Sequence, residues 1–191
     1  MKIIESIENF VPWNEQEEAD KSEFLYRLRN GENLLTRDNK SAHITVSGWV
    51  VNPARTKILM VYHNLYDSWS WLGGHADGES DLLKVAKKEV QEESGLKAVN
   101  AVKDEIFSLE ILPVSGHMKK GKYISSHLHM NVTYLLEADD TLPLRIKPDE
   151  NSDAAWFGLD EAIKKSNEQW FKERIYSKLN EKLGMAGVIN L

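Results

Sequence analysis

Three glutamates, Glu89, Glu92 and Glu93, occur near the end of a segment that is expected to be helical over residues 80–93. At about 100° per residue they share an arc of about 100° on the helical wheel. Like charges spaced three and four residues apart destabilise a helix, and negative charge near its C-terminal end opposes the helix dipole. Acidic residues on a helix usually just face solvent. Here, however, Glu89 has no basic residue at the three- and four-residue spacings, and only Glu92 has one, Lys88.

This arrangement indicates a missing cation. Hard divalent ions such as Mg²⁺ prefer oxygen ligands and keep several of their water molecules. Clustered carboxylates next to the glycine turn at Gly73 and Gly74 offer such ligands. On the same wheel Leu83, Ala86 and Val90 form the arc that is expected to face the core, beside the glutamates. The opposite arc is lysine-rich and is expected to face solvent.

The stretch from Gly74 to Leu96 resembles the Nudix box, G-x5-E-x7-R-E-U-x-E-E-x-G-U with U apolar, of the Nudix hydrolase superfamily. Its second half is matched by Lys88-Glu89-Val90-Gln91-Glu92-Glu93-Ser94-Gly95-Leu96, with lysine in place of arginine. Gly74 fills the leading glycine position, but Ser80 stands where the first glutamate belongs and Glu79 is one place early. These departures affect the supporting Arg–Glu pair of the motif and leave the three glutamates in place.

The resemblance implies an α/β/α sandwich (α/β or α+β) with a central mixed β-sheet, extending over about 43–165. It also implies hydrolysis of a nucleoside diphosphate derivative by a metal-activated water. Glu89, Glu92 and Glu93 would bind Mg²⁺ (or Mn²⁺) together with the main-chain carbonyl of Gly73, and Glu92 and Glu93 would therefore be catalytic. The alternative is a catalytically silent, Nudix-like nucleotide-sensing or interaction domain. The related isomerase chemistry relies on a cysteine, and this chain has none.

Many Nudix proteins have a further glutamate six residues before a tryptophan near the last strand. Glu150 stands six residues before Trp156, so the resemblance implies an added metal ligand or the general base. A solvated loop acid after Pro148 is an equally good interpretation.

Several residues are candidates for binding the substrate. His127 and His129 alternate on one face of an expected strand, where they would contact phosphate or base, or relay a proton. A pair of packed, hydrogen-bonded histidines is the alternative. Gly74 and His75 follow closely on a short apolar run that contains Trp71, and aromatic rings near a nucleotide can stack on its base. Aromatic residues are, however, more often part of a core.

The elements that position these residues are expected in the following order. Residues 1–40 form an N-terminal helical extension whose main helix is capped by Asn14. Residues 41–166 form the main domain, and residues 167–191 form a C-terminal helix and tail packed on it. Strands are expected at 43–51, 57–62, about 98–112, about 122–137 and 154–157, helices around 159–183, and a mobile loop at 113–121. Ser80 or Asp81 starts the helix that bears the glutamates, and Gly95 lies just past its end.

Composition narrows the function class. The 191 residues carry 24 basic and 30 acidic side chains, a net charge of −6, so a DNA-binding protein is not expected. No apolar run is long enough for a transmembrane helix, no signal peptide is apparent, and the lack of cysteine fits a reducing cytoplasm. We therefore expect a cytoplasmic enzyme acting on a small molecule. The family resemblance adds a homodimer as one expected assembly.

Overall fold

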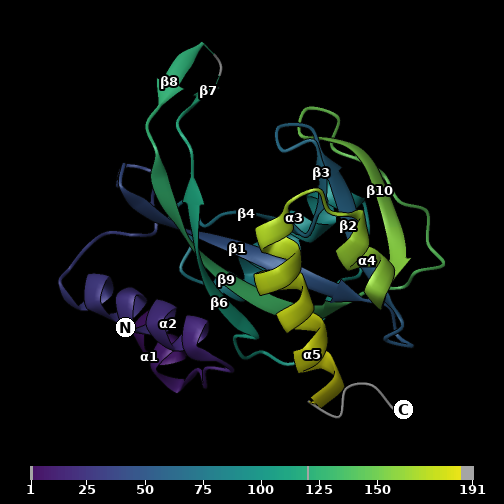
Figure 1. Ribbon diagram of the computed structural model, residues 1–191, viewed down its shortest axis with the longest axis horizontal. Coiled ribbons are helices and arrows are strands. Elements are labelled where there is room, and N and C mark those ends of the chain that lie inside the picture. The colour runs from purple at the N-terminus through teal and green to yellow at the C-terminus, as the bar shows by residue number, and fades with distance from the viewer. Residues whose placement is uncertain (1, 120, 186–191) are drawn as a thin grey trace.

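A ten-residue strand, β1 (Ala42–Val51), lies at the centre of a mixed sheet, and all ten of its residues are buried. The structure is a computed structural model that describes residues 2–119 and 121–185. On one side β1 runs parallel to β9 (His127–Glu137), in register from Ala42↔Leu128 to Val51↔Glu137. On the other side it pairs antiparallel with β4 (Leu72–His75). The parallel pair within an otherwise antiparallel sheet confirms the expected mixed sheet (Figure 1).

The remaining strands extend the sheet in both directions. β2 (Lys57–His63) joins β1 at Val51↔Ile58, so β2 and β4 share one edge of β1. Beyond β2 lies β10 (Asn151–Gly158), while the short β3 (Ser68–Ser70) pairs with the opposite edge of β2, on the side of β1 and β4. Beyond β9 lie β5 (Asn100–Ala101) and β6 (Ser108–Val114).

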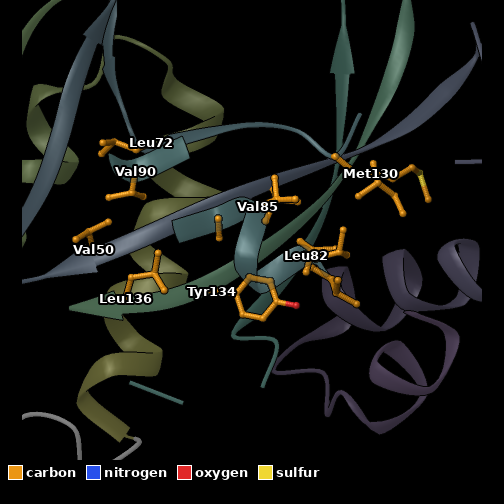
Figure 2. Close-up of a cluster of buried hydrophobic side chains, with 14 of the residues drawn as sticks. Val50, Leu72, Leu82, Val85, Val90, Met130, Tyr134 and Leu136 are labelled. Carbon is orange, nitrogen blue, oxygen red and sulfur yellow. The ribbon is translucent and has the colours of Figure 1, made fainter. Parts of the chain in front are cut away.

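Helices cover both faces of the sheet, which confirms the expected layers. On one face α3 (Leu82–Ser94) packs Val85 and Val90 against Val50, Leu72 and Leu136 (Figure 2). The opposite face is covered by α4 (Leu159–Lys165), the π-helical turn η1 (Phe171–Tyr176) and α5 (Ser177–Met185). There Trp49 stacks on Tyr176 with ring centroids 5.3 Å apart.

The N-terminal extension consists of α1 (Lys2–Asn9) and α2 (Glu15–Arg29), which pack on the core through Ile7, Phe10 and Phe24. As predicted, Asn14 caps α2 and accepts a hydrogen bond of 3.0 Å from the Glu17 N–H. The predicted division into segments 1–40, 41–166 and 167–191 stays a prediction. No helix in the described part of the chain is both long enough and apolar enough to cross a membrane.

The expected loop at 113–121 is largely strand in its described residues, so that prediction is wrong there; residue 120 lies outside the described residues. β6 continues to Val114, opposite His127 of β9, and β7 (His117–Lys119) then pairs with β8 (Lys122–Ile124). Because β6 and β9 are already antiparallel partners, the chain between them can continue their ladder outward. The result is a two-stranded ribbon that projects from the body of the molecule (Figure 1).

Candidate active site

Helix α3 presents the three glutamates because its two ends are well defined. Asp81 caps the N-terminus and accepts a 3.0 Å hydrogen bond from the Lys84 N–H. Gly95 ends the helix in the left-handed region at φ 72°, which favours glycine. These observations confirm the predicted start and end, and they place Glu89, Glu92 and Glu93 in the last two turns.

Glu93 is buried, with 3% of its surface exposed, and both of its carboxylate oxygens accept hydrogen bonds. Oε2 accepts from the Gly73 N–H at 2.9 Å, and Oε1 accepts from Asn151 Nδ2 at 3.1 Å. Burial raises the pKa of Glu93 to about 7; the two hydrogen bonds oppose this shift, and the charges of Glu89 and Glu150 add to it. The side chain is therefore held firmly while its charge is poorly compensated.

Glu89 is half-buried and lies directly against Gly74. A Cβ atom at position 74 would be 2.5 Å from Glu89 Cδ, so only glycine leaves room for the carboxylate. Burial raises the pKa of Glu89, as does the charge of Glu92, while Lys88 and Lys147 lower it. Lys88 Nζ lies 3.8 Å from Glu89 Oε1. The three- and four-residue spacings of a helix do not include this adjacent residue.

Glu92 and Glu150 complete a group of four carboxylates. Glu92 is exposed, and its Oε1 lies 3.3 Å from Lys88 Nζ, the pair that the sequence predicted. Glu150 Oε2 lies 2.8 Å from Lys147 Nζ, and the charge of Glu150 raises the pKa of both Glu89 and Glu93. Oxygen donors in this number, next to the Gly73 main chain, suit a hard dication such as Mg²⁺.

Two residues that contact these glutamates, Asn151 and Lys147, could not be identified from the sequence. Asn151 is fully buried at the start of β10 and reaches Glu93 across 58 residues of chain. Lys147 lies in the loop before β10 and forms an ion pair with Glu150. Both depend on the pairing of β10 with β2, which places the loop beside the end of α3.

The predicted core-facing arc of α3 requires a correction. Leu83 is only half-buried, whereas Leu82, Val85, Ala86, Val90 and Glu93 are buried. Glu93 therefore lies near the middle of the buried arc, because β4 covers that side of the helix.

The structure separates the predicted substrate-binding residues. The Cα–Cβ direction at Gly74 points to Glu89, whereas that at Gly73 points to Ser47, on the other face of the sheet. Strand alternation places Trp71 and His75 on the Gly73 side. Trp71 is half-buried there, edge-on to Tyr176 and Phe171 at 5.7 and 6.0 Å between centroids.

His75, His127 and His129 gather with a fourth histidine, His43, which the sequence reading did not single out. The ring centroids of His43 lie 5.1, 4.8 and 5.2 Å from those of His75, His127 and His129. This histidine cluster, His43, His75, His127 and His129, lies on the opposite face of β4 from Glu89. Contact of these histidines with a substrate stays a prediction.

Comparisons with known proteins agree with this fold. A family model of the NUDIX domain matches residues 41–179. A C. elegans Ap4A hydrolase in a binary complex is 18% identical over 76% of this chain and 97% of its own, with a TM-score of 0.53. An E. coli dihydroneopterin triphosphate pyrophosphohydrolase (11% identity, 72% and 95% coverage) and a MutT protein from Methanosarcina mazei Go1 (13% identity, 73% and 93%) have the same TM-score. No curated protein matches the chain in sequence.

Proposed function

The chain belongs to the NUDIX family, and from this premise we propose that it is a Mg²⁺-dependent hydrolase that cleaves the diphosphate linkage of a nucleoside diphosphate derivative. The observation that carries the proposal is the carboxylate group at the end of α3. Glu89, Glu92, Glu93 and Glu150 interact there by charge, and among the described residues Lys88 and Lys147 partly compensate them. A protein that never bound a cation would gain stability by losing such a cluster.

Glu89, Glu92, Glu93 and the Gly73 carbonyl would hold the dication, with Mn²⁺ as a substitute for Mg²⁺. When bound, the ion would neutralise the diphosphate and lower the pKa of the attacking water. Glu93 is oriented for this by its hydrogen bonds from Gly73 and Asn151. Glu89 approaches the turn closely because position 74 has no side chain.

Glu150 is the proposed proton acceptor for the attacking water, at one of its Oε atoms, and Lys147 positions its carboxylate at 2.8 Å. On the other face of β4, Trp71 offers a half-buried aromatic surface for a base. His75, His127 and His129 are imidazoles that can meet phosphate oxygens. We propose these four residues as the candidate substrate contacts.

The experiment is a panel of nucleoside diphosphate sugars, dinucleoside polyphosphates and (d)NTPs, assayed for released phosphate or nucleoside monophosphate with and without Mg²⁺. We expect turnover of at least one compound that disappears on addition of EDTA. Glu93→Gln should lower the rate at least about 100-fold, because one ligand charge is removed without a change of shape.

Glu161→Gln is the matched control, because Glu161 is an exposed glutamate on α4. It should retain the wild-type rate. No turnover across the panel together with no binding of Mg²⁺ would overturn the proposal in favour of a silent binding domain. Unchanged activity in Glu93→Gln would overturn the site.

A further inference from the structure

The histidine cluster supplies none of the ligands proposed for the dication at the carboxylates, and its composition is unusual for an ordinary polar patch. The chain has six histidines, and four of them form this cluster on one face of the sheet. In three of these, His43, His75 and His129, one potential ligand atom from each ring lies within 4.8 Å of the others. Imidazole nitrogen is a good ligand for Zn²⁺ and related transition metals.

Strand pairing puts these three rings together. His43 of β1 lies opposite His129 of β9 in the parallel register. His75 of β4 lies opposite Thr45, two residues further along β1. Three adjacent strands therefore direct one imidazole each to the same face, on a scaffold that is rigid because its backbone groups are paired.

The hydrogen bonds of the cluster select the nitrogen atoms that face a ligand. His43 Nδ1 is 3.2 Å from the Asn39 carbonyl oxygen, so Nδ1 is the donor and Nε2 carries the lone pair. His43 is 5% exposed, and within the described residues its buried Nε2 has no hydrogen-bond partner. Burying an unpaired acceptor is costly, and a metal ion would satisfy it.

His127 orients His129 in the same manner. His127 Nδ1 donates to the Ser125 carbonyl at 2.8 Å, so its Nε2 accepts the 3.2 Å hydrogen bond from His129 Nε2. His129 is then left with Nδ1 as its unprotonated nitrogen. Histidine ligands of metals typically donate their second N–H to a carbonyl or another acceptor in this way.

We propose that His43, His75 and His129 bind one divalent transition-metal ion of the Zn²⁺ type, with a water in the fourth position and His127 as a positioning residue. In a tetrahedral site with Zn–N bonds of 2.0–2.1 Å, ligand nitrogens lie about 3.3 Å apart. The three rings therefore need only a small inward movement. His75 and His129 are half-buried, which leaves a path for the ion.

This site is distinct from the carboxylate group, and metal binding there does not require the proposed hydrolase activity. A bound ion would take the place of the substrate contacts proposed for His75 and His129. It lies on the opposite face of β4, and it offers nitrogen where the carboxylate group offers oxygen. Mg²⁺ prefers oxygen ligands, so saturating Mg²⁺ should leave the histidines available to Zn²⁺.

The experiment titrates tag-free, EDTA-treated and desalted full-length protein with Zn²⁺ by calorimetry, and with Co²⁺ by visible absorption, in an excess of Mg²⁺. We expect one equivalent of Zn²⁺ to bind and Co²⁺ to give the strong visible bands of four-coordinate geometry. His75→Gln and His129→Gln should each weaken Zn²⁺ binding at least tenfold. His43→Gln should do the same, and far-UV circular dichroism would show whether this buried variant is folded.

His63→Gln is the matched control, because His63 lies on β2, outside the cluster, and should bind Zn²⁺ as the wild type does. Glu89→Gln should also retain the Co²⁺ bands. The proposal is overturned if the wild type binds no Zn²⁺ in excess Mg²⁺. It is equally overturned if binding survives in the folded His75→Gln and His129→Gln variants or is lost in Glu89→Gln.

Discussion

Glu93 is a charged residue of the proposed site in a position where the fold favours an apolar side chain. Its side chain occupies the middle of the buried arc of α3, a position that a leucine could fill. Instead a carboxylate is held there by the Gly73 N–H and Asn151, and burial raises its pKa to about 7. Residues that contradict the local packing pattern in this way usually serve function.

The pKa of Glu93 makes the stability of the metal-free protein depend on pH. The folded pKa of about 7 lies above the ordinary value of 4.5, so the folded chain holds this proton more tightly. The stability that the folded chain gains by holding this proton is therefore fully present below pH 4.5 and is lost as the pH rises through 7. Glu93→Gln cannot ionise, and at pH 8 in EDTA it should be more stable than the wild type by about 3 kcal/mol.

Urea denaturation at pH 5 and pH 8 measures this difference, which should be small at pH 5. The variant should fold normally because Asn151 Oδ1 is buried and, among the described residues, has no hydrogen-bond partner. Rotating the Asn151 amide would present this oxygen to the new glutamine N–H₂. Glu161→Gln should show no such pH-dependent gain, and parallel curves for wild type and Glu93→Gln would contradict the assignment.

Gly74→Ala tests the close approach between β4 and α3. The added Cβ would lie 2.5 Å from Glu89 Cδ, well inside contact distance, so the Glu89 carboxylate must move. Activity should fall at least tenfold, because small displacements of positioning groups cost about 100-fold. Gly184→Ala is the control, since a Cβ there meets no atom within 4 Å. Steady-state kinetics with a substrate from the panel measures the effect, and equal loss in both variants would contradict it.

The sequence predicted the glutamates of the site but not their neighbours, for a physical reason. Glu89, Glu92 and Glu93 are related by helical spacing, which is a local property. Asn151 and His43 belong to the two sites only because β10 pairs with β2 and β1 pairs with β9, and both pairings join distant parts of the chain. His127 and His129 were visible as an alternating pair and His75 was a separate candidate, but their proximity to one another and to His43 was not predicted.

At the scale of elements, the N-terminal and C-terminal helices are joined by buried charges. Glu17 of α2 is fully buried and lies 3.1 Å from Lys178 and 2.9 Å from Lys182 of α5. Lys178 also lies 3.0 Å from the buried Glu110 of β6. Burial alone would raise the pKa of Glu17, but the two lysines and Ser108 lower it. Helices α2 and α5 are thereby fixed to each other and to the sheet.

Removing one member of this network should be strongly destabilising. Glu17→Gln leaves Lys182 and Lys178 buried with less compensating charge, and we expect a loss of about 3 kcal/mol in the free energy of unfolding at pH 7. Glu18→Gln, an exposed neighbour on the same helix, should change stability by less than about 0.5 kcal/mol. Urea denaturation compares the two. A similar small effect for both would show that the buried pair adds nothing to stability.

The helices and most strands could be predicted from periodicity, caps and turn residues, because each of these signals is local. Asn14, Asp81 and Gly95 marked helix ends where the structure has them. Strand β7 was missed because it is short and polar, and it forms as a continuation of the pairing between β6 and β9; its partner β8 lies within the strand expected at about 122–137. The buried lysines of α5 were not foreseen, because a lysine on an amphipathic helix is ordinarily exposed.

At the scale of the whole molecule, the sheet separates two kinds of chemistry. The α3 face contains the carboxylates at the edge of an apolar core, and the other face contains the histidine cluster and the buried ion pairs. β4 lies between the two and contributes Gly74 to one face and His75 to the other. A ligand on either face would therefore bind next to the same strand, β4.

If Mg²⁺ binds the proposed carboxylates, it should stabilise the whole fold, because only the folded chain brings these side chains together. At a concentration 100 times its dissociation constant, a ligand of the folded state adds about 2.7 kcal/mol to the free energy of unfolding. For a chain of this size that corresponds to a rise in Tm of about 5–10 °C. The rise should be larger at pH 8 than at pH 6, since below the pKa of about 7 a proton on Glu93 competes with the ion. Differential scanning calorimetry of wild type and Glu93→Gln measures it; a pH-independent rise, or the same rise in the variant, would show that Mg²⁺ binds elsewhere.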